Sequence, residues 1–219
     1  MNPYLEKLDS HLGNIQRSAR DESDPHRSTI LWNYLFHGAF EVGGDWERIF
    51  TPKMIVDDPH YEMRTDTEDM RPLVLDGSDA VQEFYGLVEG EKLMLIDDGN
   101  HQLFVNDDGL AEFATTVEFT TGRAIVDDGL EKWYYRGAEV DDPDAPYVKR
   151  CRHAMFWPYT EDGRLVGEMV YQLEPFDVVP INPGDVPTLN DIQAVAERYY
   201  PERVRERLPE GAIDDRFSP

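Results

Sequence analysis

Cysteine is nearly absent from this chain, since Cys151 is the single one among 219 residues. An intrachain disulfide is therefore excluded, and this usage is typical of proteins kept in a reducing cytosol. Long apolar runs are missing as well, because no stretch approaches the roughly 18 apolar residues of a membrane span. Residues 1–20 also lack the apolar core of a signal peptide. These absences predict a cytoplasmic protein that does not enter a membrane.

Basic residues are outnumbered in the sequence. The chain has 21 Lys and Arg against 45 Asp and Glu, which gives a formal net charge of −24. A field of this sign repels the phosphates of nucleic acids and the headgroups of anionic membranes. We therefore expect neither nucleic acid nor a membrane as a partner.

The motifs that mark common cofactor and nucleophile sites are also missing. There is no GxGxxG, no phosphate-binding loop, no GxSxG and no lysine in a recognisable Schiff-base setting. Asp58, His60, His101 and His153 carry groups that can ligate a metal, but no HxH, HxxxH or paired-cysteine spacing supports a metal site. We therefore expect no cofactor and no bound metal.

The spacing of apolar residues predicts an α+β fold. Helices are expected over residues 1–20, 27–42 and 78–88, and strands over 54–64, 101–105, 110–121, 147–157 and 164–174. Turn residues at 106–109 and 160–163 connect the later strands as hairpins. Helices followed by a run of strands predict a curved mixed or antiparallel sheet wrapped around helices.

The domain organisation follows from this order of elements. We expect an N-terminal helical extension over residues 1–26 and an α+β barrel over 27–176. Within the barrel, residues 123–146 are interpreted as a lid or an extended hairpin. Residues 177–219 are expected to form a C-terminal helical arm, packed on the domain or on a neighbouring subunit.

The strand at 54–64 contains the candidate catalytic residues. Side chains alternate along a strand, so Asp58 and His60 share a face with the apolar Met54. Burial raises the pKa of a carboxylate, which allows it to act as a base near neutral pH, while an imidazole can return the proton. The alternative is a strand end at which Asp58 caps a turn and His60 lies on the surface. The pattern alone leaves both interpretations open.

Three segments, in this order, resemble the ketosteroid isomerases of the nuclear transport factor 2-like superfamily. They are Gly44-Asp45, residues 50–59 with the sequence Phe-Thr-Pro-Lys-Met-Ile-Val-Asp-Asp-Pro, and residues 77–85 with the sequence Gly-Ser-Asp-Ala-Val-Gln-Glu-Phe-Tyr. The chain also resembles the SnoaL-like polyketide cyclases and scytalone dehydratases of that superfamily. The resemblance implies a cone-shaped, cystatin-like α+β barrel.

The resemblance also implies roles for individual residues. The general base of the family falls at Asp58, and His60 has no counterpart in the isomerases. The tyrosine that donates to the oxyanion falls at His37, with Tyr34 three residues earlier on the same helical face. The second donor of the family falls near His153, which by alternation is either a pocket acid–base group or a core histidine.

An apolar pocket wall is expected at inward positions of the strands and of the lid. Its members are Met54, His101, Phe119, Trp133, Met155, Trp157, Met169 and Tyr171. With 4 Trp, 11 Tyr and 10 Phe, the chain has the aromatic side chains that line sites for flat apolar ligands.

The expected function is a cofactor-independent lyase, dehydratase or isomerase working by general acid–base catalysis. The substrate would be a hydrophobic, aromatic or polycyclic small molecule, resembling a steroid, a polyketide or a lignin-derived diaryl compound. The alternative is a non-catalytic small subunit of a ring-hydroxylating dioxygenase, or a ligand-binding protein. A homo-oligomer, dimeric or trimeric, is expected.

Overall fold

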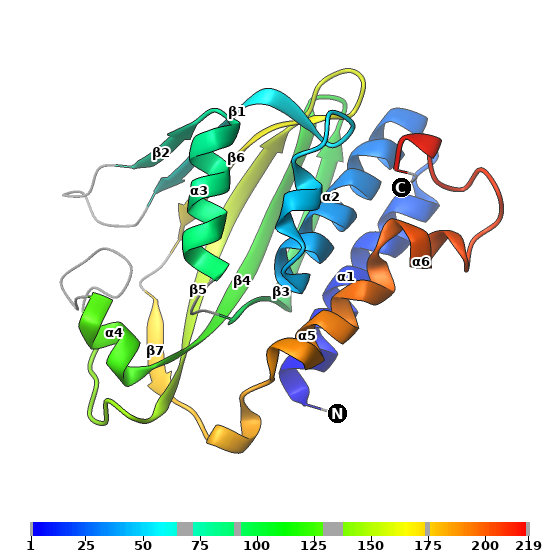
Figure 1. The fold of residues 1–219 in the computed structure, drawn as a ribbon. Coiled ribbons are helices and arrows are strands. Elements are labelled where there is room, and N and C mark those ends of the chain that lie inside the picture. Colours follow the sequence, from blue (N-terminus) through cyan, green and yellow to red (C-terminus); the bar gives the residue numbers. More distant parts are fainter. Residues whose placement is uncertain (1, 65–71, 90–92, 129–137, 174–175, 218–219) are drawn as a thin grey trace.

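A curved mixed sheet and the helices that cover it make up the structure, so the expected α+β fold class is confirmed (Figure 1). The computed structural model describes residues 2–64, 72–89, 93–128, 138–173 and 176–217. The strands are β1 Ile55–Arg64, β2 Leu73–Asp76, β3 Leu93–Asn106, β4 Gly109–Thr121, β5 Pro146–Pro158, β6 Leu165–Gln172 and β7 Asp177–Pro180. The α-helices are α1 Pro3–Asp21, α2 Pro25–Gly43, α3 Ser78–Glu89, α4 Gly122–Asp128, α5 Leu189–Ala196 and α6 Pro201–Arg205. Short 3₁₀ turns are η1 Trp46–Ile49, η2 Pro183–Asp185, η3 Glu197–Tyr199 and η4 Asp215–Phe217.

The strand order in the sheet is β2-β1-β6-β5-β4-β3, and β7 pairs with β5. All pairs are antiparallel except β1 with β6, which are parallel and place Tyr61 beside Glu168. The hairpins β3–β4 and β5–β6 follow the turn signals of the sequence. Figure 1 shows α1, α2 and the C-terminal helices together on one side of the sheet, while α3 lies near β1 and β2.

The ends of α2 follow from local chemistry. The Asp24 carboxylate accepts hydrogen bonds from the backbone N–H groups of His26 and Arg27, and Pro25 occupies the first turn. The helix ends at Gly44, whose φ of 79° is a left-handed conformation that glycine adopts without strain. The apolar run between these caps gives α2 buried residues on nearly every side, as expected for a central helix.

The first helix belongs to the main core. Leu8, Leu12 and Ile15 of α1 are buried in the same apolar cluster as Phe36 of α2. The C-terminal region joins this cluster as well, through Val204 and the residues around it. The segments expected as an N-terminal extension and a C-terminal arm therefore share one core with residues 27–176.

The Leu8→Ala variant tests this shared core. Leu8 is fully buried, so truncation removes apolar contacts and leaves a cavity, at an expected cost of about 2–5 kcal/mol. The matched control is Leu189→Ala, since Leu189 is 54% exposed and its loss should change stability by about 0.5 kcal/mol or less. Urea denaturation measures both. Equal, small effects would show that α1 is a dispensable appendage.

Residues 123–146, expected to form a lid or an extended hairpin, begin in a helix. Their first part is helical, because α4 spans Gly122–Asp128. A side chain at Gly122 would place a Cβ 2.4 Å from the Asp142 carbonyl oxygen, so a glycine permits this close crossing of the chain. Part of the segment, including Trp133, lies outside the described residues. In the part of the chain that the structure describes, no helix combines the length and apolar character needed to cross a membrane.

Candidate active site

Strand β1 turns the expected catalytic pair outward. Asp58 and His60 are exposed, and His60 Nδ1 lies 2.6 Å from Asp76 Oδ1 at the surface. The buried side chains of the strand are Ile55, Pro59 and Tyr61. The register with β6 shifts between Ile55 and His60, so the alternation is interrupted and the neighbours Asp57 and Asp58 are both exposed. The prediction that Asp58 and His60 face an interior pocket is wrong. The reason is physical: Ile55 and Tyr61 gain more from burial than a carboxylate and an imidazole, which remain solvated on the other face.

A polar stripe lies along the buried face of α2. Tyr34, His37 and Glu41 follow one another at i, i+3 and i+7, which places them on one side of the helix. His37 Nε2 is 3.1 Å from the Tyr85 hydroxyl and 3.6 Å from a Glu41 carboxylate oxygen. Burial lowers the pKa of His37 to about 4, so its imidazole is neutral at pH 7. Tyr34 and His37 are both buried, and the oxyanion-donor role that the resemblance implies at this face of the helix stays a prediction.

Glu41 is the carboxylate of this stripe. Burial raises its pKa to about 7, although its side chain still exposes 23% of its surface. The two values describe a carboxylate that is enclosed by protein without being sealed from solvent. At neutral pH, Glu41 is therefore close to half ionised and can both accept and release a proton.

The second carboxyl group with a raised pKa is that of Glu168 on β6. It lies beside Tyr61 in the parallel β1–β6 pair, and the register of β5 with β6 places Trp157 next to it. Burial raises the pKa of Glu168 to about 8, the negative charge of Glu41 adds to this, and the Trp157 indole acts in the opposite direction. At pH 7 the Glu168 side chain is mainly a neutral carboxylic acid.

Three buried phenols surround these carboxyl groups. The hydroxyls of Tyr61, Tyr85 and Tyr159 have pKa values well above the usual one, because of burial and because the charge of Glu168 acts on each. They therefore stay protonated and can donate hydrogen bonds. Among the described residues, the Tyr159 hydroxyl has no hydrogen-bond partner, whereas the Tyr61 hydroxyl interacts with that of Tyr85.

The carboxyl pair has a defined chemical capacity. Two nearby carboxylates do not both ionise readily, so the pair retains a proton at a pH where isolated glutamates have lost theirs. One group then serves as a base while the other, with the phenols, serves as a donor to oxygen. This arrangement is suited to moving a proton and stabilising an oxyanion.

A second buried carboxylate lies further along the sheet. Glu112 of β4 is fully buried and accepts a hydrogen bond from the Tyr34 hydroxyl. Burial acts to raise its pKa, but His101, His11 and Tyr34 outweigh burial, so the pKa of Glu112 is lowered and the group is ionised. His101, expected as part of an apolar wall, instead contacts this carboxylate.

His153 lies apart from the carboxyl pair. Its Nδ1 is 3.2 Å from the Thr116 hydroxyl, and burial, followed by the charge of Lys149, lowers its pKa to about 4. It is therefore a neutral histidine held by a strand neighbour. This environment favours the core interpretation over the acid–base one.

The expected apolar wall is only partly assembled. Met54, Phe119, Met155 and Trp157 are buried. Met169 and Tyr171 lie on the outer face, since Met169 pairs with the exposed Phe156 and the Tyr171 ring lies 5.8 Å from the Phe156 ring. The prediction that these two point inward is wrong. The register pairs odd-numbered residues of β5 with even-numbered residues of β6, so Met169 and Tyr171 lie beside the even-numbered residues of β5, such as the exposed Phe156.

Sequence reasoning missed most of the interior polar groups. They are Glu41, Tyr61, Tyr85, Glu112, Tyr159 and Glu168. A signal was present for the two glutamates on strands, Glu112 and Glu168, because each alternates with apolar residues along its strand. Glu112 alternates with Leu110 and Ala114, for example. A carboxylate at such a position must be buried with partners or carry a shifted pKa.

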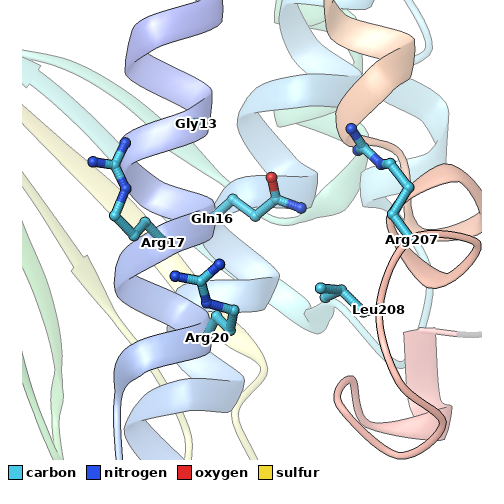
Figure 2. A pocket seen from close by; sticks show the side chains of 6 residues that line it. All are labelled: Gly13, Gln16, Arg17, Arg20, Arg207 and Leu208. Carbon is cyan, nitrogen blue, oxygen red and sulfur yellow. The ribbon is translucent and has the colours of Figure 1, made fainter.

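A separate hollow of about 290 Å³ opens between α1 and the chain after α6 (Figure 2). It is lined by Gly13, Gln16, Arg17, Arg20, Arg207 and Leu208. Arg20 pairs with Asp21 at 2.8 Å, and Arg207 donates to the carbonyl oxygens of Arg198 and Arg203. Arg17 donates to Asn14 Oδ1 at 3.0 Å, so all three guanidinium groups are engaged, and the hollow lacks the interior carboxyl groups.

Comparison with known proteins yields structural likeness alone. No family model matches the chain, and no curated protein matches it. A proposed polyketide cyclase from Xanthomonas campestris pv. campestris is 15% identical, with 67% of this chain and 91% of that chain covered and a TM-score of 0.41. A phenazine biosynthesis-related protein from Pseudomonas aeruginosa is 11% identical, with 84% and 97% covered and a TM-score of 0.38.

An NTF2-like protein with a cystatin-like fold from Novosphingobium aromaticivorans is 14% identical, with 75% of this chain and 90% of that chain covered and a TM-score of 0.35. One of these three proteins is described as a polyketide cyclase and another as NTF2-like. Each TM-score is below 0.5, so the chemistry has to be argued from the residues of this chain.

Proposed function

We propose that this chain is an acid–base enzyme that moves a proton at a carbon atom beside an oxygen-bearing group of its substrate. Glu41 is the base, and Glu168 is the acid. The observation that carries the proposal is the enclosed pair of carboxyl groups whose pKa values are raised to about 7 and about 8 among buried phenols. Lyase and isomerase reactions both begin with such a step.

The proposed chemistry follows from the protonation states. An ionised Glu41 removes a proton from carbon, and its raised pKa makes it a stronger base than an ordinary glutamate. Negative charge then develops on the substrate oxygen. Neutral Glu168, together with the hydroxyls of Tyr61 and Tyr159, supplies hydrogen-bond donors for that oxygen. Transfer of the proton from Glu41 to another atom, or loss of a leaving group, completes the reaction.

The surroundings of the pair favour a neutral, aromatic substrate. The Tyr34 and Trp157 rings lie 4.6 Å apart, and the Trp46 and Tyr85 rings are stacked at 5.8 Å. Aromatic side chains of this kind bind flat apolar molecules. The net charge of −24 disfavours anions. A hydrophobic aromatic or polycyclic compound with a carbonyl or hydroxyl group fits these features, and steroid-like, polyketide-like and lignin-derived diaryl compounds all qualify.

The Glu41→Gln variant tests this proposal against Asp58→Asn, a matched change at an exposed carboxylate. A panel of neutral aromatic ketones and hydroxy compounds is incubated with enzyme in D₂O, and NMR follows exchange or loss of carbon-bound hydrogen. Glu41→Gln should lower the rate by roughly 10²–10⁴-fold, the usual contribution of a general base. Asp58→Asn should retain the wild-type rate.

Two outcomes would contradict the assignment. If Asp58→Asn lost activity and Glu41→Gln kept it, chemistry would take place at the outer face of β1. If the wild-type chain bound aromatic compounds without exchanging their hydrogens, it would be a ligand-binding protein. Circular dichroism of each variant confirms that the fold is retained.

A further inference from the structure

Three side chains from separate elements meet beside the sheet, and neither Glu41 nor Glu168 is among them. They are His11 of α1, His101 of β3 and Glu112 of β4. One ligand atom from each lies within 4.8 Å of the others. His101 Nδ1 is 2.5 Å and His11 Nε2 is 3.9 Å from the same oxygen, Oε1 of Glu112. The two imidazole rings meet edge to face at 4.7 Å.

We propose that His11, His101 and Glu112 form a binding site for a divalent transition-metal ion of the Zn²⁺ class. Two imidazoles and one carboxylate are a common protein ligand set for zinc, whereas Mg²⁺ and Ca²⁺ prefer oxygen ligands alone. Zinc–ligand bonds of about 2.0–2.2 Å place neighbouring tetrahedral ligands roughly 3.4 Å apart. The separations in this cluster bracket that value, so side-chain rotations of small amplitude would close it around an ion.

The burial of the cluster supports a bound cation. Glu112 is fully buried, His11 is 1% exposed, and the His101 side chain is 10% exposed. A buried carboxylate requires a compensating positive charge. His101 Nδ1 lies 2.5 Å from Glu112 Oε1, so the ligand atoms of these two side chains face each other directly. Two such atoms facing each other are bridged well by a metal ion.

The second oxygen of Glu112 is held from the other side. The Tyr34 hydroxyl donates a hydrogen bond to Oε2, which leaves Oε1 directed toward the imidazoles. Hydrogen bonds of this kind orient ligands around protein metal sites. The apolar residues Leu8 and Leu12 of α1 are buried on either side of His11 in sequence, so the site is closed by the core. The ion would fasten α1 to the sheet.

The inference goes beyond the proposed function, because neither Glu41 nor Glu168 is a ligand. No sequence spacing reveals this site, since its ligands stand 90 and 11 positions apart along the chain, from residue 11 to 101 and from 101 to 112. The expectation that no metal binds rested on the absence of a local motif. The assembled cluster replaces that expectation with a testable proposal.

The test uses the full chain after treatment with a chelator. Isothermal titration with ZnCl₂ should show one ion per chain with micromolar or tighter affinity, and zinc should raise the melting temperature. Co²⁺ should give the visible absorption of a tetrahedral nitrogen and oxygen site. MgCl₂ at the same concentration should produce neither effect.

Two histidine variants distinguish the site from surface binding. His101→Gln should weaken zinc binding at least 100-fold and abolish the cobalt spectrum. His60→Gln is the matched control, because His60 also lies close to a carboxylate, Asp76, but at the surface. It should leave both measurements unchanged. Absence of zinc binding in the wild-type chain, or loss of binding in His60→Gln but not in His101→Gln, would overturn the proposal. The Co²⁺ absorption is measured on folded protein. His11→Gln provides a second ligand variant, so the test still works if one of the two variants does not fold.

Discussion

The Glu168→Gln variant is expected to lose turnover by roughly 10²–10⁴-fold. Glutamine has the shape of glutamic acid but carries no transferable proton, so the oxygen of the substrate loses its acid while the packing beside Tyr61 and Trp157 is kept. The control is Glu161→Gln, at an exposed position in the turn between β5 and β6. It should have the wild-type rate. Steady-state kinetics on the substrate identified by hydrogen exchange provides the measurement.

The pH profile makes this prediction sharper. The reaction requires Glu41 ionised, above about pH 7, and Glu168 protonated, below about pH 8. The wild-type kcat/KM should therefore follow a narrow bell, with apparent pKa values that belong to the pair. In Glu168→Gln the residual activity should lose its alkaline limb. An unchanged alkaline limb would assign that ionisation to another group.

The raised pKa of Glu168 determines how the free energy of unfolding changes with pH. Between the usual glutamate pKa and about 8, folded Glu168 holds a proton that the unfolded chain has released. Its contribution to folding is therefore complete at low pH and is lost as the pH rises through 8. The Glu168→Gln variant has no ionisable group at this position, so it does not lose stability in this way. Relative to wild type, the variant should gain roughly 3 kcal/mol in unfolding free energy between pH 6 and pH 9.

The Gly167→Ala variant is expected to disrupt the fold. A Cβ at this position would lie 1.9 Å from the carbonyl oxygen of His60, the residue with which Gly167 pairs between the parallel strands β1 and β6. Neither backbone can yield without breaking the pairing. The expected cost is at least about 4 kcal/mol, or failure to fold. Because Tyr61 and Glu168 are the next residue pair, any variant that folds should also be inactive.

Gly38→Ala is the matched control for this prediction. Gly38 lies within α2, and a Cβ there would meet no atom within 4 Å. Alanine should stabilise the helix by about 0.5–1 kcal/mol. Thermal or urea denaturation compares the two variants. If Gly167→Ala were as stable as wild type, the close parallel pairing of β1 with β6 would be contradicted.

The elements of the fold could be predicted from periodicity and turn chemistry. The helix over 27–42 and both hairpins were expected, because an apolar run, a glycine stop and tight-turn residues are local signals. Strand β7 was missed, since its pairing with β5 joins residues distant in sequence. The parallel pairing of β1 with β6 is non-local in the same way.

The main error in the predicted site was the choice of which face of β1 is buried. Alternation separates Asp58 from Tyr61 but does not state which of them is inside, and this depends on what packs against the strand. The resemblance to isomerases favoured Asp58, whereas the structure buries Tyr61. The same limitation applies to Met169 and Glu168, which occupy opposite faces of β6. Buried glutamates at apolar positions were the more informative signal.

Direct titration of the glutamate side chains tests the central claim. Carbon-13 NMR of chain labelled at the glutamate carboxyl carbon follows each group from pH 4 to pH 10, and the Glu41→Gln and Glu168→Gln spectra assign the two resonances. The structure predicts two carboxyl groups that remain protonated at pH 6 and titrate near 7 and 8. If every glutamate titrated near the unperturbed value of about 4.3, the interior would hold no neutral acid and the proposed chemistry would be contradicted.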